Sequence, residues 1–165
     1  MNWEAIGVIT EIIGVIVVVI TLAYLAVQLR QNNELLRSES RQALVSNDLT
    51  SLSNNIDHAD IFERYVSGSE LSATDQLRLS FMFALDLRNR EFEYFQFTNG
   101  ILDEESWLTY RNVILINHST GMGRKWWDEI GREFVDSGFA EQVDELLVNA
   151  EPDESYQRMT TWART

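Results

Sequence analysis

The stretch AIGVITEIIGVIVVVITLAYLAVQL, residues 5–29, decides the fold of this chain. It contains no basic residue, and its departures from apolar character are Thr10, Glu11, Thr21 and Gln28. As a helix it would be roughly 37 Å long, enough to cross a hydrocarbon layer of about 30 Å with some tilt. In lipid a lone span satisfies its backbone only as a helix, so we predict a transmembrane helix over residues 1–30.

A cleaved signal peptide is the main alternative to a membrane anchor at this end of the chain. Signal peptides begin with basic residues and have a shorter apolar region that precedes a small-residue cleavage site. Here no basic residue precedes Arg30, so we expect an uncleaved anchor. Arg37 and Arg41 follow Arg30. By the positive-inside rule, we expect the chain after the span to lie in the cytoplasm, with the N-terminus outside.

The small and polar residues of the predicted span, with Val18 and Leu25 between them, recur at alternating intervals of four and three. The positions concerned are Gly7, Glu11, Gly14, Val18, Thr21, Leu25 and Gln28. This is the spacing of the contact seam of a left-handed coiled coil. Because small and polar residues let membrane helices approach closely, the stripe predicts a helix–helix interface or, with enough copies, a pore lining. A lone anchor with these residues in register by chance is the alternative.

Glu11 is an ionisable residue in this apolar setting, and three placements would accommodate it. A ring of Glu11 side chains around a wet lumen would favour cations, with Thr21 and Gln28 lining the same lumen. A protonated Glu11 could instead form a hydrogen bond between two helices. If the hydrocarbon begins at Ile12, Glu11 lies among the headgroups, and the remaining span to Val27 is roughly 24 Å long.

The rest of the chain has the pattern of a soluble all-α domain. Residues 31–56 contain no Pro or Gly, so the membrane helix is expected to continue as a stalk. Fraying or a break is expected among the Ser and Asn residues between 46 and 55. We predict a helical bundle over residues 57–150 and a polar tail over 151–165, which docks through Tyr156, Met159 and Trp162 or stays loose.

Helix ends in the bundle are predicted from capping residues. Ser72 and Asp103 are N-cap candidates, and Asn99-Gly100 is expected to end a helix that begins at Ala73. That helix is apolar on more than one face, so we expect it to be the buried central helix. Further helices are expected at about 104–119, 124–136 and 139–149, with Gly138 ending the second of these.

Composition limits the partners of the chain. The 165 residues carry 26 acidic and 13 basic side chains, a formal net charge of −13. Such a surface repels the phosphate backbone, so nucleic acid is not an expected partner. The absence of cysteine excludes disulfides, thiolate metal sites and a cysteine nucleophile. Membrane lipid and further copies of the chain are the partners we expect.

Four segments of the sequence resemble a widespread group of small bacterial membrane-anchored helical proteins without an assigned function. They are the apolar helix that ends in Gln28-Leu-Arg-Gln31, the segment from Gly100 to Trp107, Lys125-Trp-Trp127, and the segment from Phe139 to Leu147. The resemblance covers most of the chain. It implies the same architecture and carries no activity.

No pattern of catalytic, cofactor or metal-binding residues stands out, so the chain is not expected to be an enzyme. The two histidines, His58 and His118, belong to no helical metal-binding pair, and His118 is expected as a cation at a helix end. Gly121-Met-Gly-Arg-Lys125 lacks P-loop spacing and is expected to join two helices. Asp86 and Arg90 are predicted to form an i,i+4 pair.

The function predicted from these patterns is a homo-oligomeric membrane channel. The stripe from Gly7 to Gln28 would line its pore or its helix–helix interface, with Glu11 attracting cations. The alternative is a membrane-anchored scaffold or sensor whose cytoplasmic helical domain binds a partner protein.

Overall fold

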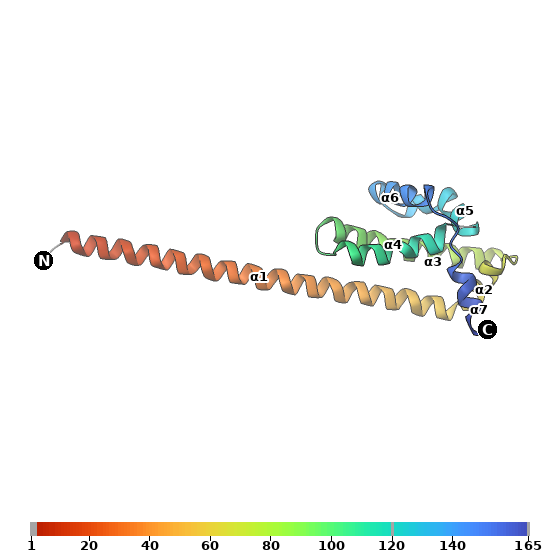
Figure 1. Ribbon diagram of the computed structural model, residues 1–165, viewed down its shortest axis with the longest axis horizontal. Helices are drawn as coiled ribbons and strands as arrows, with labels where there is room; N and C mark the ends of the chain where they lie inside the picture. The colour runs from red at the N-terminus through yellow and green to blue at the C-terminus, as the bar shows by residue number, and fades with distance from the viewer. Residues whose placement is uncertain (1–2, 120, 165) are drawn as a thin grey trace. The chain divides into compact units, whose positions relative to one another are not determined.

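The computed structural model of the protein describes residues 3–119 and 121–164, and no strand occurs among them. The predicted class, a long apolar N-terminal helix followed by an all-α domain, is therefore confirmed (Figure 1). The α-helices are α1 (Trp3–Asp57), α2 (Ala59–Ser67), α3 (Ala73–Thr98), α4 (Glu104–His118), α5 (Gly121–Glu129), α6 (Ser137–Val148) and α7 (Ser155–Thr161). Two short 3₁₀ helices, η1 (Gly131–Phe134) and η2 (Trp162–Arg164), follow α5 and α7.

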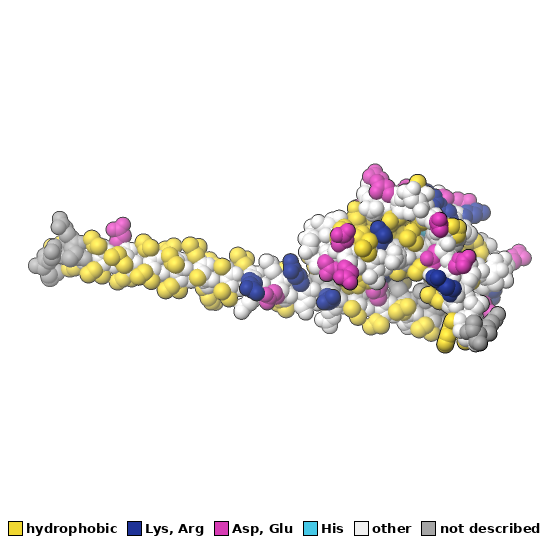
Figure 2. Space-filling view, viewed as in Figure 1, with side chains coloured by type: hydrophobic (Ala, Val, Ile, Leu, Met, Phe, Trp, Pro, Cys, Tyr) yellow, Lys and Arg dark blue, Asp and Glu magenta, His cyan; other side chains and the backbone are white. Residues whose placement is uncertain are grey.

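The chain divides into two compact units, Met1–Gln42 and Ala43–Thr165, and α1 contributes to both. In the first unit hydrophobic side chains cover α1 on the N-terminal side of its arginines (Figure 2). The second unit holds the helical bundle together with the last turns of α1. The second half of the predicted stalk is therefore part of the bundle's own compact unit.

The expected break between residues 46 and 55 is wrong, because α1 is continuous to Asp57. Contacts from α3 hold these turns in place. The Leu44 side chain is 2% exposed, Asp48 pairs with Arg90, and the Ser51 hydroxyl accepts a hydrogen bond of 2.8 Å from the Asn89 amide. Tertiary packing thus stabilises a helix whose Ser and Asn residues have low intrinsic propensity.

The predicted N-caps of the bundle are present. The Ser72 hydroxyl accepts a hydrogen bond from the backbone N–H of Asp75 at 3.1 Å, and the Asp103 carboxylate accepts one from Ser106 at 2.8 Å. After α3, Gly100 adopts a left-handed backbone conformation with φ of 69°, a conformation that glycine adopts without strain. These helix ends are therefore set by capping residues next to them in the sequence.

The helices after Gly121 differ from the prediction. The helix expected over 124–136 begins earlier, at Gly121, and ends at Glu129, after which η1 bends the chain. Gly138 does not end a helix but lies in the first turn of α6, which Asp136 caps by accepting a hydrogen bond from Phe139 at 2.9 Å. The Asp136 cap outweighs the helix-breaking tendency of a single glycine.

The core of the bundle forms around α3, as predicted, but one face of this helix is solvent-exposed. Its buried positions include Leu79, Phe83 and Leu87, which pack with apolar residues of α2, α4, α5 and α6. The opposite face carries Leu77, Phe81 and Phe95, which are 57–60% exposed. The apolar character of α3 on several faces therefore indicates a core helix with an additional uncovered surface.

The C-terminal segment, residues 151–165, is partly ordered against the bundle. Tyr156 on α7 packs against Phe62, with ring centroids 5.5 Å apart, and its hydroxyl donates a hydrogen bond to the side-chain oxygen of Asn117. Met159 and Trp162 are 60% and 76% exposed. Of the aromatic residues expected to dock this tail, Tyr156 makes the buried contact.

Candidate functional site

The apolar segment of α1 is the first candidate site. It is the one helical segment, among the described residues, that is long and apolar enough to cross a membrane. None of the side chains in its most apolar stretch is buried. A core helix of a soluble protein would bury one face against its own chain. This segment instead leaves every face open to lipid or to another chain.

The predicted stripe residues all lie on this segment and all are exposed: Gly7, Glu11, Gly14, Val18, Thr21, Leu25 and Gln28. A Cβ atom added to Gly7 or Gly14 would meet nothing within 4 Å. These glycines are therefore not required by packing within the chain. Their small size matters only to a neighbour outside it.

The neutral polar groups of the stripe each donate one hydrogen bond within the helix itself. The Thr21 hydroxyl donates to the backbone carbonyl of Val17 at 2.8 Å, and the Gln28 amide donates to the Tyr24 hydroxyl at 2.7 Å. Glu11 makes no hydrogen bond or ion pair with any described residue. The stripe thus presents one carboxyl group without a partner among the described residues, together with two polar groups that each donate one bond inside their own helix.

A buried charge cluster in the bundle is a second candidate that sequence reasoning found only in part. The guanidinium of Arg90, 2% exposed, lies among three carboxylates from α1 and α3. Its Nη2 atom is 2.5 Å from Asp48 and 3.1 Å from Glu93, and its Nε atom is 3.9 Å from Asp86. The predicted Asp86–Arg90 pair is confirmed, but it is buried and belongs to a larger cluster.

Glu93 has the most perturbed acidity in this cluster. Burial raises the pKa of its carboxyl to about 8, and the positive charge of Arg90 opposes this shift only in part. Apart from the Arg90 contact, neither carboxyl oxygen has a hydrogen-bond partner among the described residues. This shift favours the protonated form of Glu93 at neutral pH, which leaves Asp48 and Asp86 as the other acids beside the Arg90 guanidinium.

The cluster continues through hydrogen bonds to α4 and α7. The Asn117 amide donates to Asp86 at 2.7 Å, while its backbone carbonyl accepts from the Tyr65 hydroxyl at 3.2 Å. Tyr156 donates to the Asn117 side-chain oxygen. These bonds connect α1, α2, α3, α4 and α7 in one network, which is typical of a structural tie. Among the residues that the structure describes, no three or more histidine or acidic side chains are placed together so that they could hold a metal ion.

His118 differs from its prediction. It is fully buried between Phe83 and Trp126, with ring centroids 5.0 and 5.5 Å away, and burial lowers its pKa to about 4. It is therefore neutral at pH 7 and is not the helix-end cation that the sequence suggested. Its position near the end of α4 is correct, but the aromatic shell removes the water that a charged imidazole needs.

The glycine-and-base segment does not join two helices as predicted, but forms the first turns of α5, which begins at Gly121. A Cβ on Gly123 would lie 1.8 Å from the backbone oxygen of Asn117, so glycine permits a close contact between α4 and α5. Arg124 donates to the Leu147 carbonyl at 2.9 Å and pairs with Asp128 at 3.2 Å. Lys125 lies 3.8 Å from Glu129. Both cations have acidic partners, which disfavours an anion site.

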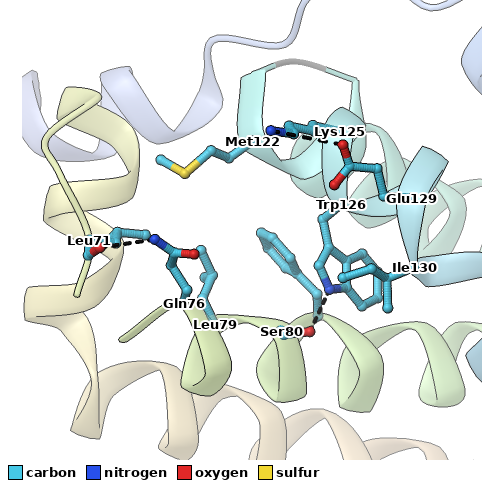
Figure 3. A pocket seen from close by; sticks show the side chains of 10 residues that line it. Leu71, Gln76, Leu79, Ser80, Met122, Lys125, Trp126, Glu129 and Ile130 are labelled. Carbon is cyan, nitrogen blue, oxygen red and sulfur yellow. Dashed lines mark hydrogen bonds and ion pairs between the residues drawn. The ribbon is translucent and has the colours of Figure 1, made fainter. Parts of the chain in front are cut away.

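A pocket of about 290 Å³ lies between α3 and α5 (Figure 3). Phe83, Trp126 and aliphatic side chains form its walls. The Trp126 indole donates to Ser80 at 2.6 Å, and the Gln76 amide donates to the Leu71 carbonyl at 3.0 Å. Lys125 and Glu129 face each other at the rim. Because these polar groups already have partners, few remain to orient a ligand.

Comparison of the chain with protein-family models, with curated proteins and with solved structures gave no match. The resemblance to bacterial membrane-anchored proteins therefore stays a prediction. The geometry of the chain itself has to support any assignment of function.

Proposed function

We propose that this protein is a single-pass protein of the bacterial inner membrane that self-associates through α1 and acts as a scaffold. The apolar segment of α1 would span the bilayer. Arg30, Arg37 and Arg41 follow that segment, and the rule for basic residues then places the helical bundle in the cytoplasm. The sequence-based prediction of a channel becomes the second candidate.

The observation that carries the proposal is the open stripe of α1. A Cβ atom added to Gly7 or Gly14 would meet nothing within 4 Å beyond the backbone of its own helix, and the stripe side chains from Glu11 to Gln28 are exposed. Small residues along one helix face allow two backbones to approach, which gains dispersion contacts and lets polar groups pair. A second α1 supplies such a face, whereas lipid chains gain nothing from it.

The hydrogen bonds that Thr21 and Gln28 donate support a scaffold better than a pore. Thr21 and Gln28 both donate to groups of their own helix, at 2.8 and 2.7 Å. A water-filled lumen would instead be lined by polar groups that bond to water or ions. With one donor of each group engaged inside the helix, fewer polar hydrogens are directed at a lumen, which favours packing between helices over a pore.

A cation channel remains the second candidate because of Glu11. This carboxyl group lies in an apolar segment and has no partner among residues 3–119 and 121–164. In a ring of copies it would concentrate cations at one level of the membrane. The same carboxyl would also be satisfied by a hydrogen bond to the stripe of a neighbouring helix.

The mass of the full-length protein in nanodiscs, measured by native mass spectrometry, tests the proposal. We expect a uniform oligomer, and Gly14→Leu should shift it toward the monomer because the larger side chain separates the helices. Ile13→Leu on a neighbouring face is the matched control and should leave the mass unchanged. A monomeric wild-type protein would contradict both functions.

Conductance separates the two candidates. As a scaffold, the reconstituted protein should pass no more current than protein-free membranes, with or without Glu11→Gln. A cation current that Glu11→Gln reduces would favour the channel instead.

A further inference from the structure

The last turns of α1, in the second compact unit, carry an apolar strip that the described residues leave mostly exposed. Val45, Leu49, Leu52 and Ile56 are 51%, 62%, 57% and 74% exposed. Their spacing of four, three and four residues places them on one flank of the helix. We call these four residues the α1 flank.

The α1 flank is distinct from the face of α1 that packs on the bundle. That inner face carries Leu44, Asp48 and Ser51, which are bonded to or buried against α3. At about 100° per residue, the flank lies about a quarter turn from the inner face. The back of the helix carries Ser46, Thr50 and Ser53, which are exposed and polar.

We propose that the α1 flank binds the α1 flank of a second copy of the chain, with the two helices parallel. This inference rests on the proposed function and extends the self-association of α1 from the membrane into the second unit. Three features of the chain favour a second copy over another partner.

The first feature is charge. From Ala43 to Ile56 the only charged residue is Asp48, and Asp48 is paired with Arg90. The chain as a whole carries −13, so two copies repel each other wherever their acidic surfaces meet. The uncharged α1 flank is a surface on which two copies can approach without that repulsion. A cationic partner, in contrast, would be drawn to the acidic surfaces.

The second feature is orientation. A single-pass helix enters the membrane in the same direction in every copy, so the α1 helices of neighbouring copies run parallel. Four side chains per copy bury less than the roughly 1,200 Å² of a stable interface between free proteins. Attachment to one membrane, and to the proposed contact within it, raises the effective concentration enough for a small interface to form.

The third feature is register. Every seventh residue from the predicted membrane stripe to the α1 flank belongs to one series: Gly7, Gly14, Thr21, Gln28, Leu35, Gln42, Leu49 and Ile56. Residues seven apart stay on one seam when two helices supercoil left-handed. Leu49 and Ile56 of the flank continue this series. The other series of the stripe, Glu11, Val18 and Leu25, continues to Ser46 and Ser53 instead of Val45 and Leu52, so the contact would have to shift to the other side of the shared series along α1. Trapping at Ser46 and Ser53 therefore measures whether the seam shifts or continues unchanged.

Disulfide trapping tests the proposal directly, because the chain has no cysteine and each variant carries a single thiol. Leu49→Cys, Leu52→Cys and Ile56→Cys probe the flank. Ser46→Cys, Thr50→Cys and Ser53→Cys probe the back of the same turns. In full-length protein in nanodiscs, under mild oxidation, we expect the flank variants to form covalent dimers at least roughly tenfold faster, because paired Cβ atoms must lie within about 4.5 Å.

A charge placed beside the thiol provides the second readout. Leu52→Arg, added to Leu49→Cys, should abolish dimer formation because two like charges would face each other across the seam. Thr50→Arg, added to the same variant, is the matched control and should leave the rate unchanged. Equal effects of the two arginines would contradict the proposal.

Failure of this inference is distinguishable from failure of the proposed function. An oligomeric mass with slow trapping at all six positions would leave self-association through the membrane stripe intact and overturn the flank contact. Faster trapping at the back positions would also overturn it. A monomeric mass with slow trapping would overturn both.

Discussion

The two compact units of this chain use the same apolar residues in opposite ways. In the first unit Val18 is 57% exposed and lies among other exposed aliphatic side chains of α1. In the second unit Val143 is fully buried beside Trp127 and Phe139 in the bundle core. The bundle removes its own apolar surface from water, whereas the described apolar side chains of the first unit stay exposed.

Polar residues show the reverse contrast. In the first unit the Thr21 hydroxyl bonds to its own helix. In the second unit Arg90 and Glu93 are buried and depend on side chains from α1 and α3. The stability of the bundle should therefore be sensitive to single polar substitutions, while the folding of α1 should not. Each prediction below pairs a change in one unit with a matched change in the other.

Arg90→Met should have the largest effect on the unfolding free energy of the bundle. The substitution leaves Asp48 and Asp86 without their counter-charge in a buried site, which costs about 3–5 kcal/mol. Arg30→Met, which removes an exposed pair with Glu34, should change it by less than about 0.5 kcal/mol. Urea unfolding in nanodiscs, followed by tryptophan fluorescence, measures both. Equal effects would mean that the Arg90 cluster is solvated.

Gly123→Ala is the next largest change. The new Cβ would lie 1.8 Å from the Asn117 carbonyl oxygen and 2.8 Å from the Tyr65 hydroxyl, so α4 and α5 must separate. We expect a loss of about 3 kcal/mol in the unfolding free energy. Gly14→Ala meets nothing within the chain and should leave bundle unfolding unchanged. If Gly123→Ala unfolds like the wild type, the close contact between α4 and α5 is not required.

Glu93 should make the stability of the bundle fall as pH rises. Its pKa in the folded protein is about 8, above the ordinary value of 4.5 for the unfolded chain, so between these values the folded state holds a proton that the unfolded state has released. The stability is fully present below pH 4.5 and is lost as pH rises through 8. Between pH 6 and pH 8 the wild type should lose about 2 kcal/mol.

Glu93→Gln removes this titration and should flatten the pH dependence over the same interval. Glu11→Gln in the first unit is the control and should leave bundle unfolding unchanged at both pH values. Equilibrium unfolding at pH 6 and pH 8 provides the measurement. A wild type that is equally stable at the two values would show that Glu93 is already ionised in the fold.

The contrast between the units also explains which features could be predicted from sequence. Ser72, Asp103 and Gly100 act through bonds to their own neighbours, and each was found correctly. The break expected between residues 46 and 55 was wrong because the contacts of Asp48 and Ser51 come from α3, about forty residues away. Local propensity cannot register such contacts.

Only part of the buried charge cluster could be predicted from the sequence, because the rest of it depends on contacts between helices. Asp86 and Arg90 lie four residues apart on one helix, so their pairing is visible in the sequence. That Asp48 joins them, and that Glu93 points inward, depends on how α1 and α3 pack. A signal was present in the acid–base spacing of α3, but spacing does not distinguish a buried face from a solvated one.

Thr21→Val should have the smallest effect, and it tests the stripe most directly. Valine has nearly the same shape as threonine and removes a hydroxyl that already donates to Val17 within the helix. If the stripe packs dry against another α1, the native mass in nanodiscs should not change. Ser80→Ala in the bundle removes the acceptor of the Trp126 indole and should cost about 1 kcal/mol of unfolding free energy. A change of mass with Thr21→Val would mean that the hydroxyl bonds outside its own helix, to another copy or to water. That result would weaken the preference for a scaffold over a water-filled pore, because the preference depends on this hydrogen bond staying inside α1.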